Sequence, residues 1–144
     1  SSTLARSSAA SDVYKRQLRE ADLPTFPPIR GDWTADFGYF AGKELSRRRD
    51  FTAVFVANDQ MAIGLMHGFR DAGVRVPEDV SVVGFDDIPV AAHVAPTLST
   101  VHQDFPELGR RAVRILLAQI RGEQVPEFGP LQTTLRTRES SAPR

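Results

Sequence analysis

From Leu18 onward the chain alternates between short apolar runs and stretches in which apolar residues recur at helical spacing. Continuous apolar runs are typical of strands buried on both faces, and helical spacing is typical of amphipathic helices. Strands are therefore predicted at 52–57, 80–85 and 98–102, with a short extended piece at 28–31 and a half-exposed last strand at 131–137, and helices at 34–47, 60–72 and 106–121. This alternation predicts an α/β fold with a mainly parallel sheet.

The predicted helix ends carry residues that helix ends favour. Thr34 is suited to cap the first helix, and either Asn58 or Asp59 can cap the second. Gly73 is expected just past the end of the second helix, and Pro106 in the first turn of the third. These signals fix where the predicted helices begin and end.

Composition narrows the class of protein. The 144 residues carry 18 basic and 18 acidic side chains, so this stretch lacks the strongly basic character of a nucleic-acid-binding surface. Hydrophobic residues make up 41% of the chain and charged residues 25%, as in a globular domain. No apolar run approaches the ~20 residues of a membrane helix. The absence of cysteine excludes a disulfide scaffold and a thiol nucleophile, and agrees with a cytoplasmic location.

Residues 1–17 differ from the rest of the chain, because serine and alanine dominate and no periodicity is sustained. Two interpretations are open. The segment is either a disordered leader or a non-native extension, since residues 12–17 resemble one reading frame of the transposon-end adaptor used in sequencing libraries. In the second case the native sequence begins at about Leu18. Amplifying the locus from source DNA across the junction after residue 17 would distinguish the two.

Polar or aromatic residues follow every predicted strand except the last. They are Asp32-Trp33, Asn58-Asp59-Gln60, Asp86-Asp87 and Gln103-Asp104. Ligands of open α/β sheets bind outside the carboxyl ends of the strands, so we expect these side chains to share one edge. Carboxylates accept hydroxyl hydrogen bonds, carboxamides donate and accept them, and an indole offers a flat face to a sugar ring or a base. The set indicates a site for a polyhydroxylated or heterocyclic small molecule.

Each of these residues also has a purely structural interpretation. Asn58 or Asp59 could only cap the helix that follows, and the pair at 86–87 could only form a turn. Trp33 could belong to a core or an interface, and Gln103 could be ordinary polarity at a strand end. Taken singly the signals are weak, and their coincidence at one edge strengthens all of them.

Signals for catalysis are weaker. The three histidines lack the spacing of a zinc site, and the chain has neither a phosphate-binding glycine loop nor a nucleophile motif. We therefore expect no enzymatic activity, no metal and no cofactor. The enzymatic alternative is a carboxylate-dependent reaction on a sugar or phosphate ester that uses Asp59, Asp86 and Asp87. Loss of such turnover on Asp86→Asn would favour it.

Several separated strings are distinctive in combination. They lie at 31–33, 56–64, 75–89, 96–105 and 108–109. In this order and spacing they resemble the LacI/GalR (lac-repressor-type) family of bacterial transcriptional regulators, and the resemblance covers about Leu18 to the end. It implies a type I periplasmic-binding-protein-like fold of two lobes, with the effector in the cleft between them.

The resemblance also implies roles for single residues. Trp33 would stack on the effector, and Asn58 and Asp86 would hydrogen-bond it. Gln103 would line the same pocket. Phe105 would lie where the chain crosses to the other lobe and would also line the cleft. The helix from residue 61 and the segment after residue 87 would form part of a dimer surface.

By the same resemblance, residues 18–144 are a truncated effector-binding domain, mostly its C-terminal lobe. Residues 18–103 and 131–144 would belong to that lobe, and 104–130 to the N-terminal lobe. No helix-turn-helix lies in this stretch, so operator DNA would be bound only through an absent segment. The apolar stripe of the last helix would lack its partner, which costs roughly several kcal/mol, so we expect the chain alone to be unstable or to aggregate.

The intact protein implied is a cytoplasmic homodimer whose operator binding is controlled by a small effector such as a sugar. A periplasmic sugar-binding protein of a transporter shares the fold and is the alternative. An upstream helix-turn-helix would favour the regulator, whereas a signal peptide would favour the transporter.

Overall fold

The computed structural model describes residues 16–24, 26–48 and 50–143. The chain divides into two units, residues 1–31 and residues 32–144. In the first unit residues 16–20 are helical and a turn follows at 21–22. The predicted leader at 1–17 lies outside the described residues except for its last two positions.

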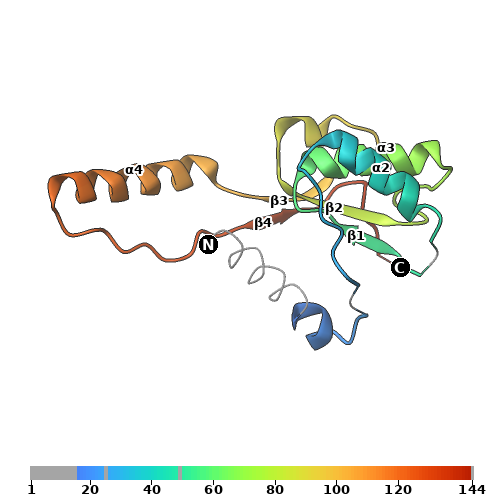
Figure 1. Ribbon diagram of the computed structural model, residues 1–144, viewed down its shortest axis with the longest axis horizontal. Coiled ribbons are helices and arrows are strands. Elements are labelled where there is room, and N and C mark those ends of the chain that lie inside the picture. The colour runs from blue at the N-terminus through green and yellow to red at the C-terminus, as the bar shows by residue number, and fades with distance from the viewer. Residues whose placement is uncertain (1–15, 25, 49, 144) are drawn as a thin grey trace. The chain divides into compact units, whose positions relative to one another are not determined.

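The second unit is built on a four-stranded sheet with the order β1-β2-β3-β4 (Figure 1). β1 (Ala53–Phe55), β2 (Ser81–Asp86) and β3 (Ser99–His102) are parallel, and β4 (Thr134–Arg136) pairs antiparallel with β3. The prediction of a mainly parallel α/β sheet is confirmed. The extended piece predicted at 28–31 is not a strand of this sheet, because Pro28 and the preceding Pro27 have no backbone N–H to donate.

Two helices pack on the sheet, and a third is the longest element. α2 (Ala35–Leu45) and α3 (Asp59–Asp71) lie together on one face of the sheet, and α4 (Phe105–Arg121) follows β3 (Figure 1). A short 3-10 helix, η1 (Pro89–Ala92), connects β2 to β3. The predicted helices are therefore present, with α2 ending two residues earlier than expected.

Glycines allow α2 and α3 to approach backbone to backbone. A Cβ added at Gly38 of α2 would collide with the carbonyl of Met61, and one added at Gly64 of α3 would collide with the carbonyl of Ala35. Both glycines are therefore required by close packing, and a larger residue would push the helices apart. This contact sets the positions of the two helix N-termini relative to each other.

The hydrophobic core lies between this helix pair and the sheet. Its fully buried members include Ala62 and Phe69 of α3, Val82 of β2, and Leu98 just before β3. Phe37 of α2 packs against this cluster from the side. The core therefore packs α3 against the central strands, and α2 packs mainly against α3.

The second face of the sheet is open in this unit. Phe55 of β1 is 47% exposed, and it meets Phe85 of β2 edge to face with 6.3 Å between ring centroids. The prediction that 52–57 is buried on both faces is therefore wrong for the described chain. The physical reason is that helices of residues 32–143 cover only one face.

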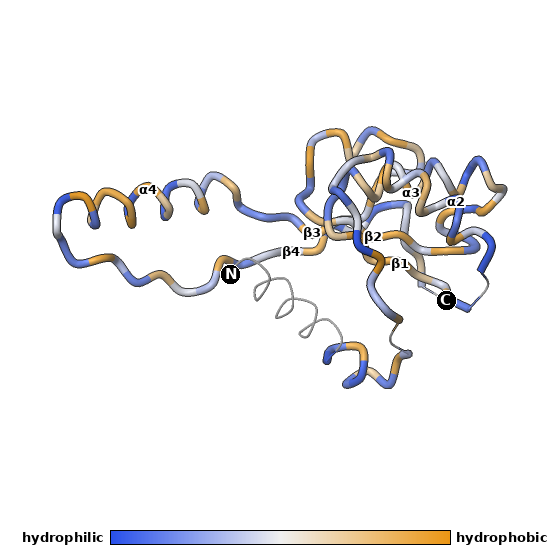
Figure 2. The backbone as a smooth tube through the Cα atoms, in the orientation of Figure 1, coloured by the Kyte–Doolittle hydropathy of each residue, from blue (hydrophilic) through white to orange (hydrophobic). Residues whose placement is uncertain are grey.

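α4 is strongly amphipathic and exposed. Asp104 caps its N-terminus, and Gly122 ends it at φ 64° in the left-handed conformation. Figure 2 shows apolar and polar residues alternating along the helix. Its exposed apolar side chains are Phe105, Leu108, Val113, Leu116, Leu117 and Ile120. None of the helices among the described residues is long and apolar enough to span a membrane.

Candidate functional site

The N-termini of α2 and α3 meet at the carboxyl edge of the sheet. Thr34 caps α2 as predicted, since its Oγ1 accepts the backbone N–H of Phe37 at 3.1 Å. Asn58, and not Asp59, caps α3, and its Oδ1 accepts the N–H of Met61 at 2.9 Å. The two capping residues thus place the residues beside them, Trp33 and Asp59, at this edge.

Trp33 is held in an uncommon backbone conformation with an exposed side chain. Its φ is 72°, a region that bulky residues rarely adopt. The carbonyl of Trp33 accepts a hydrogen bond from Nδ2 of Asn58 at 3.0 Å, and Asp32 accepts the backbone N–H and the hydroxyl of Thr34. The indole is 63% exposed, so the structural alternative of a core residue is excluded within the described chain. A strained, exposed aromatic held from both sides is typical of a binding site.

Asp86 and Gln103 come together across the ends of β2 and β3. Nε2 of Gln103 donates to Oδ1 of Asp86 at 2.9 Å. Burial raises the pKa of Asp86, the charge of Asp59 adds to the increase, and the hydrogen bond from Gln103 opposes it. Among the described residues Gln103 is the one hydrogen-bond partner of the Asp86 carboxylate, so Oδ2 retains acceptor capacity for a hydroxyl.

Asp87 points to a different set of partners. Its carboxylate accepts Nη2 of Arg138 at 2.7 Å and lies 3.0 Å from Nδ1 of His102. Burial acts to raise the pKa of Asp87, but the hydrogen bonds and charges of Arg138 and His102 together hold it below its ordinary value. The adjacent aspartates therefore have separate tasks, since Asp86 faces Gln103 just past β3, whereas Asp87 ties the end of β2 to His102 of β3 and to Arg138 just past β4.

Two of these residues share the backbone strain found at Trp33. Asp86 has φ 113° and Asp87 has φ 55°, both in the region that favours glycine. Together with Trp33 they place three strained residues at the same edge of one sheet. Such conformations persist where surrounding contacts hold them, and they cluster at ligand sites.

The five predicted site residues are thus placed as follows. Trp33 is hydrogen-bonded to Asn58, and Asp86 is hydrogen-bonded to Gln103. All four residues lie at the carboxyl edge of the parallel strands. Asn58 is buried and uses its side chain for capping and for holding Trp33, so it already has a structural task there. Phe105 begins α4 two residues after Gln103 and is half exposed.

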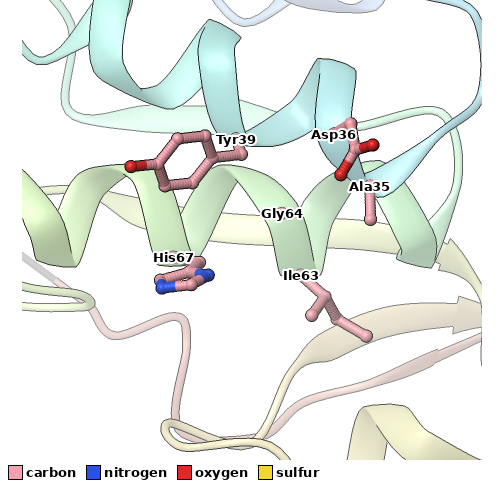
Figure 3. A pocket seen from close by; sticks show the side chains of 6 residues that line it. All are labelled: Ala35, Asp36, Tyr39, Ile63, Gly64 and His67. Carbon is pink, nitrogen blue, oxygen red and sulfur yellow. The ribbon is translucent and has the colours of Figure 1, made fainter.

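The hollow drawn in Figure 3 lies elsewhere and is lined by none of these five residues. It measures about 320 Å³ and is lined by Ala35, Asp36, Tyr39, Ile63, Gly64 and His67 of α2 and α3. The rings of Tyr39 and His67 meet edge to face there, 5.2 Å apart. The Tyr39 hydroxyl donates to Asp71, which raises the pKa of Tyr39.

Sequence reasoning missed Thr100 and Arg138, and it placed Asp59 at this edge without its supporting role. Thr100 and Asp59 are fully buried behind Asp86 and Asp87, and Arg138 reaches Asp87 from the far end of the chain. A threonine inside a predicted buried strand was the available signal for Thr100, because a buried hydroxyl needs a partner. The described residues contain no group of three or more His, Cys, Asp or Glu side chains placed to hold a metal ion.

Comparison with known proteins decides the family. A model described as the periplasmic binding protein-like domain matches residues 6–141. The chain is 40% identical over 111 residues to the HTH-type transcriptional repressor PurR of Vibrio atlanticus, and 44% identical over 112 residues to the HTH-type transcriptional regulator CelR of Thermobifida fusca. The chain belongs to the LacI/GalR family of effector-binding domains.

The LacI/GalR-type chain spans about a third of the length of the curated relatives it matches. The alignments cover 75% of the chain and 33% of PurR, and 76% of the chain and 33% of CelR. These relatives are transcriptional regulators, which favours the regulator interpretation over the alternative of a transporter's sugar-binding protein.

Solved structures agree with this assignment. A transcriptional regulator CelR–cellobiose complex matches with a TM-score of 0.81 at 39% identity. The match covers 89% of the present chain and 40% of the CelR chain. The lac repressor dimer bound to operator and an anti-inducer matches with a TM-score of 0.80 at 33% identity. The match covers 89% of the present chain and 45% of the lac repressor chain. The predicted periplasmic-binding-protein-like fold is confirmed.

Proposed function

We propose that this chain is the effector-binding part of a regulator whose binding to operator DNA is controlled by a sugar or similar polyhydroxylated molecule. The observation that carries the proposal is the clustering of three strained residues at one sheet edge, among them Trp33 with its exposed indole and Asp86 with its hydrogen-bond partner Gln103. One structural neighbour is a complex of the regulator CelR with cellobiose, which supports a sugar as the ligand class.

Each side chain has a chemical task in this proposal. The indole of Trp33 stacks on the C–H face of a sugar ring, which is apolar. Oδ2 of Asp86 accepts a hydroxyl hydrogen bond, and Gln103 both donates and accepts beside it. Asn58 and Phe105 complete the wall, with Asn58 acting mainly through the position of Trp33.

Ligand binding would change operator affinity through the rest of the protein. Residues 104–130 belong to the other lobe in this proposal. The segment at 103–105 then connects the two lobes and would change conformation when they close. A ligand that prefers one arrangement of the lobes shifts the population of the two, and the difference in its affinity for them sets the change in DNA binding.

We also propose that the surface formed by α2 and α3 is part of a homodimer contact. Ile63 and His67 lie on α3 at the rim of the hollow, and the neighbouring lac repressor structure is named as a dimer. Light scattering of the complete gene product, unchanged and with Ile63→Glu, tests this contact. A mass of one protomer in the unchanged protein would overturn it.

The decisive test of the site uses calorimetry and DNA binding on the complete product of the gene that encodes this chain. Cellobiose, ribose and adenosine serve as probes of a disaccharide, a pentose and a heterocyclic nucleoside. Asp86→Ala should abolish the response to the effector and leave operator binding intact, because it removes the hydroxyl acceptor and the partner of Gln103 within the effector site alone. Glu123→Ala, which removes an exposed carboxylate beyond α4, should change neither. A full effector response in Asp86→Ala would contradict the assignment.

A further inference from the structure

The strained turn after β2 needs a device that holds it. Asp86 and Asp87 both adopt positive φ values, and Ile88 follows them directly. Residues with side chains leave such conformations unless hydrogen bonds or packing compensate. Asp86 is the last residue of β2 and the first of the turn 86–88, so the direction of its carboxylate depends on this turn.

Two fully buried side chains supply the hydrogen bonds. Oδ2 of Asp59 accepts the backbone N–H of Ile88 at 2.9 Å, and Oδ1 accepts the hydroxyl of Thr100 at 2.6 Å. Thr100 in turn accepts the backbone N–H of Asp87 through Oγ1 at 3.3 Å. The backbone amides of two consecutive turn residues therefore end on one buried pair of side chains.

The burial of Asp59 is unusual for an acidic residue. Asp59 and Thr100 are both 0% exposed, and no cation contacts Asp59 among the described residues. A buried carboxylate is unfavourable unless its oxygens are hydrogen-bonded, which the turn and Thr100 accomplish. Its place in the first turn of α3 adds the favourable end of the helix dipole.

The pair is packed closely against the sheet. A Cβ at Gly84 of β2 would collide with Oδ1 of Asp59, so the carboxylate sits directly against the strand that leads into the turn. Thr100 is paired with Gly84 in the register of β2 and β3. The turn is thus held against β2, β3 and α3.

We propose that Asp59 and Thr100 are positioning residues of the ligand site, which hold the 86–88 turn so that Asp86 presents its carboxylate beside Gln103. The inference rests on the proposed function and deepens it, since neither residue touches ligand. It assigns Asp59 a task other than the capping or acid–base roles that its sequence position suggests.

Affinity measured against stability tests the proposal on the complete gene product. Thr100→Val removes the hydroxyl at nearly constant volume, and Thr100→Ser keeps it. Thr100→Val should weaken binding of cellobiose, ribose or adenosine, whichever the unchanged protein binds, by on the order of tenfold, as for one lost buried hydrogen bond. Thr100→Ser should restore affinity to within about twofold.

Ser140→Ala is the matched control for a loss of stability alone. Ser140 is also fully buried, and its hydroxyl donates to the carbonyl of Val82, away from the turn. This variant should lower the melting temperature and leave affinity unchanged. Unchanged affinity in Thr100→Val, or an equal loss of affinity in Ser140→Ala, would overturn the proposal.

A readout without ligand separates this inference from the proposed function. Hydrogen exchange of peptides covering residues 86–88 should accelerate by on the order of tenfold in Thr100→Val and in Asp59→Asn, and stay unchanged in Ser140→Ala. If the unchanged protein binds none of the three probes, the sugar proposal fails on its own. If exchange at 86–88 is unaltered in both variants, the positioning role fails whatever the ligand.

Discussion

α3 and α4 are both amphipathic helices with capped N-termini, yet α3 buries its apolar residues and α4 exposes them. Phe69 of α3 is fully buried between the sheet and α2, whereas Ile120 of α4 is 71% exposed. The two sequences are similarly patterned, so the pattern alone does not decide burial. What differs is the presence of a partner with a matching surface.

The partner of α3 is fitted to it at the level of backbone atoms. Gly38 and Gly64 let α2 and α3 touch carbonyl to Cα, and the core fills the space below them. In α4, a Cβ at Gly109 would meet nothing within 4 Å. The comparison teaches that a glycine in a helix is informative only together with what lies opposite.

The largest difference is expected from truncating one large apolar residue on each helix. Phe69→Ala should lower the free energy of unfolding of the 144-residue chain by about 3–5 kcal/mol, because it opens a cavity in the core. Ile120→Ala should change it by less than about 0.5 kcal/mol. Urea titration followed by circular dichroism measures both, at a protein concentration low enough to avoid the expected aggregation, and the absence of a cooperative transition in the unchanged chain would confirm its expected instability. Equal losses in the two variants would mean that α4 is as well packed as α3.

Adding one methyl group to a glycine of each helix should give effects of opposite sign. Gly64→Ala should destabilise the chain by about 1–3 kcal/mol, since the new Cβ collides with the carbonyl of Ala35. Gly109→Ala should stabilise α4 by about 0.5–1 kcal/mol, because alanine is the better helix former and space is free. Thermal melts followed at 222 nm report both changes, and a stabilising Gly64→Ala would show that the helices are farther apart than described.

Charged pairs offer the same comparison. The lowered pKa of Asp87 means that its ion pair stabilises the fold above its unfolded pKa, about 3.9, and that this contribution is lost as pH falls through the lower folded pKa. Asp87→Asn should lower stability at pH 7 by about 1.5–3 kcal/mol and flatten the acid limb of the stability curve. Glu107→Gln on α4 should have a smaller effect, because solvent screens its pairs with Arg110 and Arg111.

The smallest expected effect is the most direct test of what covers α4. Ile120→Gln should leave the free energy of unfolding of the 144-residue chain within about 0.5 kcal/mol and reduce self-association seen by light scattering. The same change in the complete gene product should be clearly destabilising if another part of the protein packs on this stripe. No difference between the two backgrounds would mean that the stripe faces solvent in both.

Local sequence signals predicted the frame of the fold. Thr34 and Asn58 sit at the caps where side-chain acceptors are required, and Gly73 adopts φ 75° just past α3. The meeting of Asp86 and Gln103 also followed from sequence, because parallel strands deliver their carboxyl ends to one edge. These features depend on local chemistry or on a general rule of the architecture.

Other features depend on contacts that no local signal encodes. The positive φ of Trp33 was not predicted, because one of the contacts that hold it comes from Asn58, 25 residues later. The bond from Arg138 to Asp87 spans 51 residues. The exposure of Phe55 was missed because an apolar run looks the same whether one face or both are covered.

The positive φ of Asp86 sets thermostability against function. Glycine adopts φ 113° without strain, so Asp86→Gly would relax the backbone there while deleting the acceptor of the proposed ligand site. Under the proposed function, a laboratory selection for heat resistance alone would therefore favour a more stable protein that no longer responds to its effector.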